Sequence, residues 1–207
     1  MSALVEPNEH DRFILRQRIR PVVNQYEFFL PGDDSNLGVP ICFVEQARFK
    51  FKEDIRFYAD DSKQQELLRI KARQRFDPRA RYDVTAADGG KIGEIQKVFG
   101  ASLLRSTYAL FDAQGNEVAT ASEKSMFVAL FRRAVGFIPY VGDFADWLPI
   151  PYHFDFKRGD TLLGTHTRQA WKFRDTYTID MSGDPQRTLD RRLILAIAVG
   201  MDALQAR

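Results

Sequence analysis

The feature that most constrains the fold is a run of nine uncharged residues at the C-terminus, Leu193 to Met201, in the stretch TLDRRLILAIAVGMDALQAR. As an α-helix this run is about 13–14 Å long, far short of the ~30 Å hydrocarbon core of a bilayer. Its apolar residues nevertheless occupy every side of the helix, which a helix on a protein surface does not require. Such a helix needs a protein enclosure, and a curled sheet of many strands would supply one. Arg191, Arg192 and Asp202 are expected where the helix meets water.

The rest of the chain carries the signature of β structure. The 207 residues include 17 Phe and 7 Tyr, and short runs of Thr, Val and Ile accompany them, a composition that favours strands. Three units, beginning at Tyr82, Tyr108 and Tyr152, have an apolar residue two positions on, Gly seven positions on and an apolar residue ten positions on. Such a unit predicts a β-hairpin, because Gly supplies the positive φ of a tight turn. Many antiparallel strands in one sheet tend to close, since closure removes exposed edges, so a barrel is predicted.

The expected elements follow from the same patterns. Residues 1–11 are expected to form a flexible polar tail, and residues 12–207 one domain. The C-terminal helix is expected to be capped by Thr188, with Asp190 in its first turn. Strands are expected near 13–19, 26–30, 41–48, 51–59 and 66–76, a loop at 31–36, and a helix from Ser125 to about Val135.

Three stretches carry a resemblance to a known family: LLRIKARQRFDPRARYDVTAADGGKIGEI, YALFDAQGNEVATASE and the hydrophobic C-terminal helix. Over roughly residues 12–204 the chain resembles the LURP-one-related and phospholipid-scramblase-like group, which shares its fold with the C-terminal domain of Tubby proteins. The resemblance implies a mainly β fold, an antiparallel barrel of about twelve strands around the C-terminal helix. Tubby-like domains bind phosphoinositides through basic side chains, and scramblases are associated with lipid movement. No acidic calcium-binding segment of the scramblase kind is found, so calcium-dependent scrambling is not expected.

Two rows of cations form the first candidate binding surface. Residues two apart on a strand point to one face, which would align the rows on the outside of the barrel. On neighbouring strands the rows would form an anion-binding site suited to phospholipid headgroups, with about 1 kcal/mol of membrane attraction per surface cation. The alternative is a solvated outer face that acids such as Asp54 and Glu66 neutralise. The residues of the two rows are Arg48, Lys50 and Lys52, and Arg69, Lys71, Arg73 and Arg75.

An apolar segment at residues 131–154 forms the second candidate surface. Charged residues interrupt it well short of the ~20 apolar residues of a membrane span, so no transmembrane helix is expected. Its aromatic residues suit a membrane interface or a protein partner, and the alternative is a helix and loop that cover one mouth of the barrel. The residues that would make this contact are Phe137, Ile138, Tyr140, Phe144, Trp147 and Leu148.

Signals of catalysis or metal binding are absent from the sequence. His10, His153 and His166 have no metal-ligand spacing, and no nucleophile elbow, Walker A or dinucleotide-binding motif occurs. Cys42, the one cysteine, lies in an apolar run and is expected to be buried. We therefore expect no cofactor, no metal and no enzymatic activity.

Charge and the N-terminal sequence bound the function further. The net charge is +2 and no aromatic stacking platform accompanies the cations, so a nucleic-acid partner is not expected. The N-terminus lacks the apolar stretch of a signal peptide, which favours a cytoplasmic protein, peripheral at the inner membrane surface if it binds lipid. The leading hypothesis is a non-enzymatic domain that binds anionic phospholipid or another anionic partner. The alternatives are a lipid-handling protein that engages bilayers through residues 131–154, and a protein-interaction module with no lipid role.

Overall fold

The computed structural model describes residues 4–18, 23–33, 37–47, 54–73, 81–98, 106–124, 153–169 and 176–205. These residues form a closed barrel of strands and one α-helix, α3 (Arg191–Gln205), with a short 3₁₀ helix, η1 (Pro7–Glu9), near the N-terminus. The strands are β1 (Arg12–Arg18), β2 (Val23–Pro31), β3 (Leu37–Ala47), β4 (Asp54–Tyr58), β5 (Glu66–Ala72), β6 (Arg81–Ala86), β7 (Lys91–Val98), β8 (Thr107–Asp112), β9 (Glu117–Glu123), β10 (His153–Arg158), β11 (Thr161–Arg168) and β12 (Thr176–Asp180).

The barrel is an antiparallel meander that closes on itself. Each strand pairs with the next in sequence, and β1 pairs with β12 through the register Arg12↔Asp180 to Arg16↔Thr176. Closure leaves no edge strand among the twelve, which removes the unpaired backbone groups that an open sheet would expose. The mainly β barrel predicted from the sequence and from the family resemblance is confirmed.

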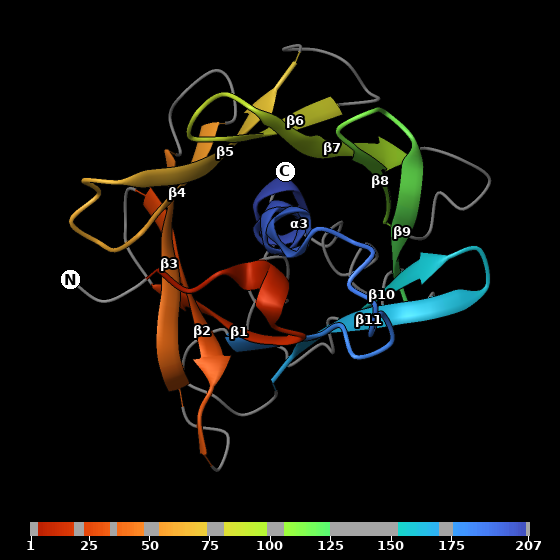
Figure 1. Ribbon diagram of the computed structural model, residues 1–207, viewed down its shortest axis with the longest axis horizontal. Coiled ribbons are helices and arrows are strands. Elements are labelled where there is room, and N and C mark those ends of the chain that lie inside the picture. The colour runs from red at the N-terminus through yellow and green to blue at the C-terminus, as the bar shows by residue number, and fades with distance from the viewer. Residues whose placement is uncertain are drawn as a thin grey trace, which may run out of the picture.

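The C-terminal helix runs through the middle of this barrel (Figure 1). Residues Leu193 to Val199 and Met201 are each at most 2% exposed, so the helix is buried on all sides, as its sequence predicts. Inward-facing strand residues such as Phe13, Phe57 and Phe156 belong to the same core. Gly93 lets β7 approach the helix closely, because a Cβ there would meet Leu193 at 3.1 Å.

The three predicted hairpins are formed by β6–β7, β8–β9 and β10–β11. Gly89, Gly115 and Gly159 have φ values of +85°, +88° and +56°, the backbone conformation that required glycine at these positions. In the first turn, the Asp88 carboxylate accepts a hydrogen bond from the Gly90 amide at 2.8 Å. A turn, rather than a phosphate-binding loop, accounts for this glycine-rich stretch.

Two strands are longer than predicted. β2 extends to Pro31 and β3 begins at Leu37, so both include residues that the sequence places in a loop or before a strand. Register shifts lie between Phe28 and Phe29 and between Phe29 and Pro31. Bulges of this kind let a strand tolerate a residue that cannot donate to the ladder, which is why the prolines did not end these strands.

The start of α3 differs from the prediction in two respects. Asp190, not Thr188, caps the helix: its carboxylate accepts from the Arg192 amide at 2.9 Å, while Thr188 donates to Asp184. Arg191 does not meet water but is fully buried. Its charge is tolerated because carboxylates and carbonyls surround it, a condition that buried guanidinium groups require.

The buried Arg191 guanidinium joins three parts of the chain. It donates to Asp184 at 2.8 Å, to Asp11 at 2.9 Å and to the His10 carbonyl at 3.2 Å. The Arg191 amide donates to the Asn8 side chain at 2.7 Å. The described part of the N-terminal segment predicted as a tail, from Leu4 to Asp11, thus contacts the start of α3.

Candidate functional site

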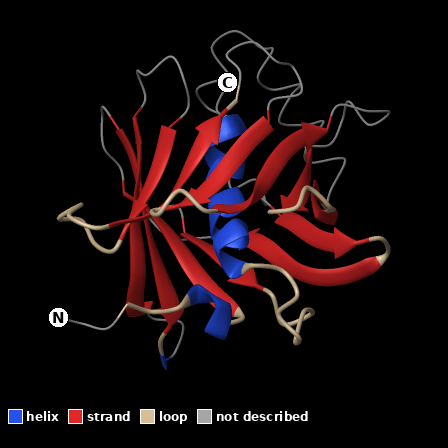
Figure 2. Ribbon diagram, turned by 45° about the horizontal axis from the view of Figure 1, so that its top comes forward, coloured by secondary structure: helices blue, strands red, loops and turns tan. Residues whose placement is uncertain are grey.

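Because a closed barrel has only two ends and an outer face, candidate binding surfaces are described by these regions. We call the end at which α3 begins the amino end and the end at which it finishes the carboxyl end (Figure 2). The pairs β1–β2, β3–β4, β5–β6, β7–β8, β9–β10 and β11–β12 are joined at the carboxyl end, and the remaining connections lie at the amino end.

The amino end is acidic. Leaving aside the 59–65 turn, the last two residues of each strand at this end, with the described connections, contain twelve Asp or Glu and five Lys or Arg. The acids are Glu6, Glu9, Asp11, Asp33, Glu66, Asp88, Asp112, Glu117, Asp160, Asp180, Asp184 and Asp190, and the cations are Arg12, Lys91, Lys157, Arg158 and Arg187.

The 59–65 turn is set apart because its charged side chains bond to residues of β1 and β3. Asp61 accepts from Arg18 of β1 at 3.3 Å, and Lys63 donates to Glu45 of β3 at 2.5 Å. Its charges are thus neutralised along the side of the barrel and do not define either end.

The carboxyl end is basic. The last two residues of each strand at this end, with the described residues that adjoin them, contain seven Lys or Arg and two Asp or Glu. The cations are Arg18, Lys71, Arg73, Arg81, Lys97, Lys124 and Arg168, and the acids are Asp54 and Glu123. Because the chain as a whole is nearly neutral, folding separates its charge along the barrel axis.

Of the cation row predicted on residues 69–75, Arg69, Lys71 and Arg73 are described, and β5 brings Arg69 and Lys71 to the outer face. Arg69 is occupied by a carboxylate: its Nε and Nη2 donate to the two Asp54 oxygens at 2.6 and 2.5 Å. Burial would raise the pKa of Asp54, but hydrogen bonds from Arg69 and Arg56 outweigh it and hold the pKa below its usual value.

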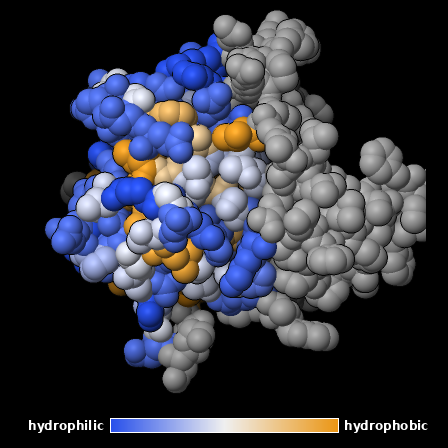
Figure 3. All heavy atoms as spheres, turned by 90° about the vertical axis from the view of Figure 1, so that its right-hand side faces the viewer, coloured by the Kyte–Doolittle hydropathy of each residue, from blue (hydrophilic) through white to orange (hydrophobic). Residues whose placement is uncertain are grey.

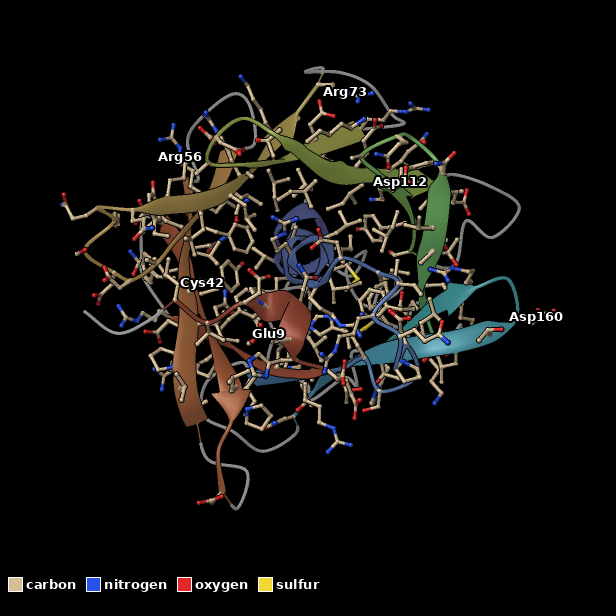
Figure 4. The ribbon with its side chains drawn as sticks, viewed as in Figure 1. Glu9, Cys42, Arg56, Arg73, Asp112 and Asp160 are labelled. Atoms are coloured by element: carbon tan, nitrogen blue, oxygen red, sulfur yellow. The ribbon has the colours of Figure 1, made fainter. Side chains whose placement is uncertain are left out.

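Arg73 is also engaged by acids. It donates to both Asp83 oxygens at 2.7 and 2.9 Å and forms an ion pair with Glu94 at 2.7 Å. Hydrogen bonds to Asp83 raise its pKa above the already high value of arginine. Figure 4 places Arg56 and Arg73 on the outside of the barrel, away from α3. These pairs match the alternative in which acids of neighbouring strands neutralise the row.

Lys71 differs from its two neighbours in the row. Its side chain is exposed, and no ion pair joins it to another described residue. Asp54 and Asp83 are its register partners on β4 and β6, yet both carboxylates bond to arginines instead. Lys71 is therefore the residue of the described row whose ammonium group faces solvent.

The other predicted contact residues lie outside the described residues. These are Arg48, Lys50, Lys52 and Arg75 of the cation rows, and Phe137, Ile138, Tyr140, Phe144, Trp147 and Leu148 of the apolar segment. At each of these segments, the strand before it ends and the strand after it begins at the carboxyl end of the barrel. The topology therefore relates the two predicted surfaces to the same end of the molecule, which the sequence pattern did not reveal.

Sequence reasoning missed the cations at the other strand ends. Lys124 and Arg168 lack the alternation that singled out the row at 69–75, and Arg81 lies beyond the end of that row. Only strand order brings them to one rim. By sequence, the six segments that join strands there and lie outside the described residues add eleven Lys or Arg and five Asp or Glu.

A shallow pocket of about 440 Å³ opens at the amino end beside Glu9, His10, Asp11 and Arg187. Arg187 and Arg191 hydrogen-bond to the Asp11 carboxylate and lower its pKa. The charged groups of this pocket thus bond to one another, as expected of a structural junction.

The histidines and the cysteine behave as structural residues. His166 lies in the core against the Tyr177 ring, 5.0 Å between centroids, and burial lowers its pKa to about 3. Burial also raises the pKa of the Cys42 thiol. Within the described ranges, no group of three or more His, Cys, Asp or Glu is placed to hold a metal ion, and no helix is long and apolar enough to cross a membrane.

On the face over β8–β11, hydrophilic residues surround small separate apolar patches (Figure 3). Leu162 is one such residue, 47% exposed. Scattered apolar residues of this kind are normal on a protein surface. This face therefore offers no broad apolar docking surface among its described residues.

A family model described as LURP-one-related matches residues 41–202. This match covers most of the chain, and the protein belongs to the LURP-one-related family. No curated protein and no solved structure matches the chain.

Proposed function

We propose that this LURP-one-related protein is a non-enzymatic binding domain that associates with anionic phospholipid at an intracellular membrane surface through the carboxyl end of its barrel. The observation that carries the proposal is the separation of charge between the two ends. A basic end attracts an anionic surface by several kcal/mol in total when each cation near it contributes about 1 kcal/mol. The acidic end disfavours the opposite approach.

We propose this contact at the strand ends rather than on the strand face. Arg69 and Arg73 each hold a carboxylate in short hydrogen bonds, so a phosphate would have to displace an internal partner to reach them. Lys71 and Lys124 are exposed cations at the carboxyl end. In this proposal Arg48, Lys50, Lys52 and Arg75 add to the attraction as residues of segments joined to the same end.

Vesicle co-sedimentation tests the proposal. We expect binding to phosphatidylcholine vesicles that contain phosphatidylserine or a phosphoinositide, and none to phosphatidylcholine alone. The double variant Lys71→Gln/Lys124→Gln removes two cations from the carboxyl end and is expected to weaken binding roughly 30-fold, at about 1 kcal/mol per charge.

The matched control removes the same charge from the amino end. Arg12→Gln/Lys157→Gln changes two cations whose side chains are 63% and 41% exposed and which pair with Asp180 at 3.1 Å and with Asp155 at 3.9 Å. Its binding is expected to stay within about twofold of the parent. Equal losses in both variants, or no binding to any anionic vesicle, would refute the proposal and favour a protein-interaction module.

A further inference from the structure

We infer that the barrel binds a planar anionic lipid surface end-on, with its carboxyl end against the headgroups, and responds to surface charge density rather than to one headgroup. The inference rests on the proposed function and specifies its geometry and its partner. Two independent observations carry it: the arrangement of cations around the rim, and the internal pairing of the arginines on the outer face.

The cations at the carboxyl end are spread around the barrel. Lys71 and Arg81 lie at the ends of β5 and β6, whereas Lys124 follows β9 and Arg168 ends β11. Figure 1 shows these strands on different sides of the helix. A twelve-stranded barrel is roughly 20–25 Å across at a strand spacing of about 4.8 Å. No small anion can contact all four residues at once, but a flat charged surface can.

The outer-face arginines are poorly placed to recognise one headgroup. Selective phosphate binding uses the bidentate fork of arginine, and the forks of Arg69 and Arg73 already bind Asp54 and Asp83. Arg73 also bonds to Glu94. Arg69 and Arg73 therefore offer no vacant bidentate site on this face.

The distance between the ends makes the orientation one-sided. Most strands, β1 and β5 to β11, have six to eight residues. At 3.4 Å per residue and a tilt of about 40°, such strands give a barrel height of roughly 16–21 Å. This exceeds the Debye length of about 8–10 Å at physiological salt. A membrane at the carboxyl end is thus screened from the excess of acids at the amino end, while a membrane at the amino end meets that excess directly.

Fluorophores on two single-cysteine variants report which end of the barrel faces the vesicle. Val98 ends β7 at the carboxyl end and is 42% exposed, and Gln114 is exposed in the β8–β9 turn at the amino end. Because β7 and β8 are neighbours, the two positions are close around the circumference of the barrel but lie at opposite ends of its axis. Val98→Cys and Gln114→Cys are labelled with a fluorophore in the full chain, and the unlabelled parent reports any reaction of the buried Cys42.

The labelled proteins are bound to phosphatidylserine vesicles that carry a headgroup quencher. We expect quenching at Val98→Cys at least fivefold greater than at Gln114→Cys. Similar quenching of both labels in a protein that binds the vesicles would overturn end-on binding and leave the proposed function intact. Absence of binding in both labelled proteins and in the parent would overturn both.

Competition distinguishes charge density from headgroup recognition and from other polyanions. Vesicles of phosphatidylserine or phosphoinositide at equal surface charge are expected to bind within about threefold of each other, and micromolar inositol trisphosphate is expected not to release the protein. Release by inositol trisphosphate would establish a headgroup site instead. Displacement by duplex DNA at equal charge concentration would contradict a lipid partner.

Discussion

At the residue scale, Arg191 shows how a charged side chain can serve the core. In the sequence its charge marks the start of the helix, and we expected it to meet water. Its ligands, Asp11 and Asp184, stand 180 and 7 residues away, so no local pattern announces them. Removing one partner of a buried ion pair typically costs 3–5 kcal/mol because the other charge is left uncompensated.

Asp184→Asn tests this network through its pH dependence. Burial alone would raise the Asp184 pKa, but the Leu189 amide, Arg191 and Thr188 bond to the carboxylate and lower the pKa to about 2. A lowered carboxyl pKa stabilises the fold above the unfolded value of about 3.9, and this stabilisation is lost as pH falls towards 2. We expect the variant to lose roughly 3 kcal/mol of unfolding free energy at pH 7.

The difference from the parent should shrink between pH 4 and pH 2, because the parent protonates Asp184 over that range. Thermal midpoints measured at pH 7, 4, 3 and 2.5 follow this change. Asp160→Asn, at an exposed turn, is the control and should track the parent throughout. A constant deficit for Asp184→Asn at every pH would contradict the assigned role of its charge.

At the element scale, α3 and the hairpins were the predictable parts. A helix that is apolar on all sides has to be buried within the protein, and glycine at these positions indicates turns with positive φ. Both predictions depend only on residues that are close in sequence. The β2–β3 extension was not predictable because bulges accommodate Pro31 and Pro40. The candidate cation row was predictable only in part: alternation on one strand revealed Arg69, Lys71 and Arg73, and Asp54 was expected among the neutralising acids, but Asp83, which pairs with Arg73, was not.

Deletion of residues 189–207 tests whether α3 is an essential part of the hydrophobic core. The inward faces of the strands pack against Leu193, Ile194 and Ile197, and without the helix these faces would surround a void that the barrel cannot fill. We expect an insoluble or aggregated product, checked by fractionation and by the absence of a cooperative thermal transition. A truncated protein that stays in solution and unfolds cooperatively would contradict this role.

At the scale of the whole molecule, the barrel combines a neutralised side with two ends of opposite sign. Ion pairs such as Arg16–Glu27 and Arg69–Asp54 cancel charge on the outer face, so the net field arises at the strand ends. This distribution follows from strand order and from which connections fall at which end. The net charge of +2 gives no information on strand order or on the position of the connections. Composition therefore gave no indication of the charge separation between the two ends.

At the amino end the N-terminal segment contacts the start of α3, and deletion of residues 1–10 tests this connection. The deletion removes the Asn8 side chain and the His10 carbonyl, which accept from the Arg191 amide and its Nε. Buried donors left unsatisfied cost about 1–3 kcal/mol each. We therefore expect unfolding to remain a single transition in urea, with its free energy lowered by roughly 2–4 kcal/mol. If residues 1–11 are instead a flexible tail, as their polar sequence predicts, the deletion will leave the urea midpoint unchanged.

Vesicle binding of the folded truncated protein should match the parent, because the cations that we propose for this binding lie at the opposite end of the barrel.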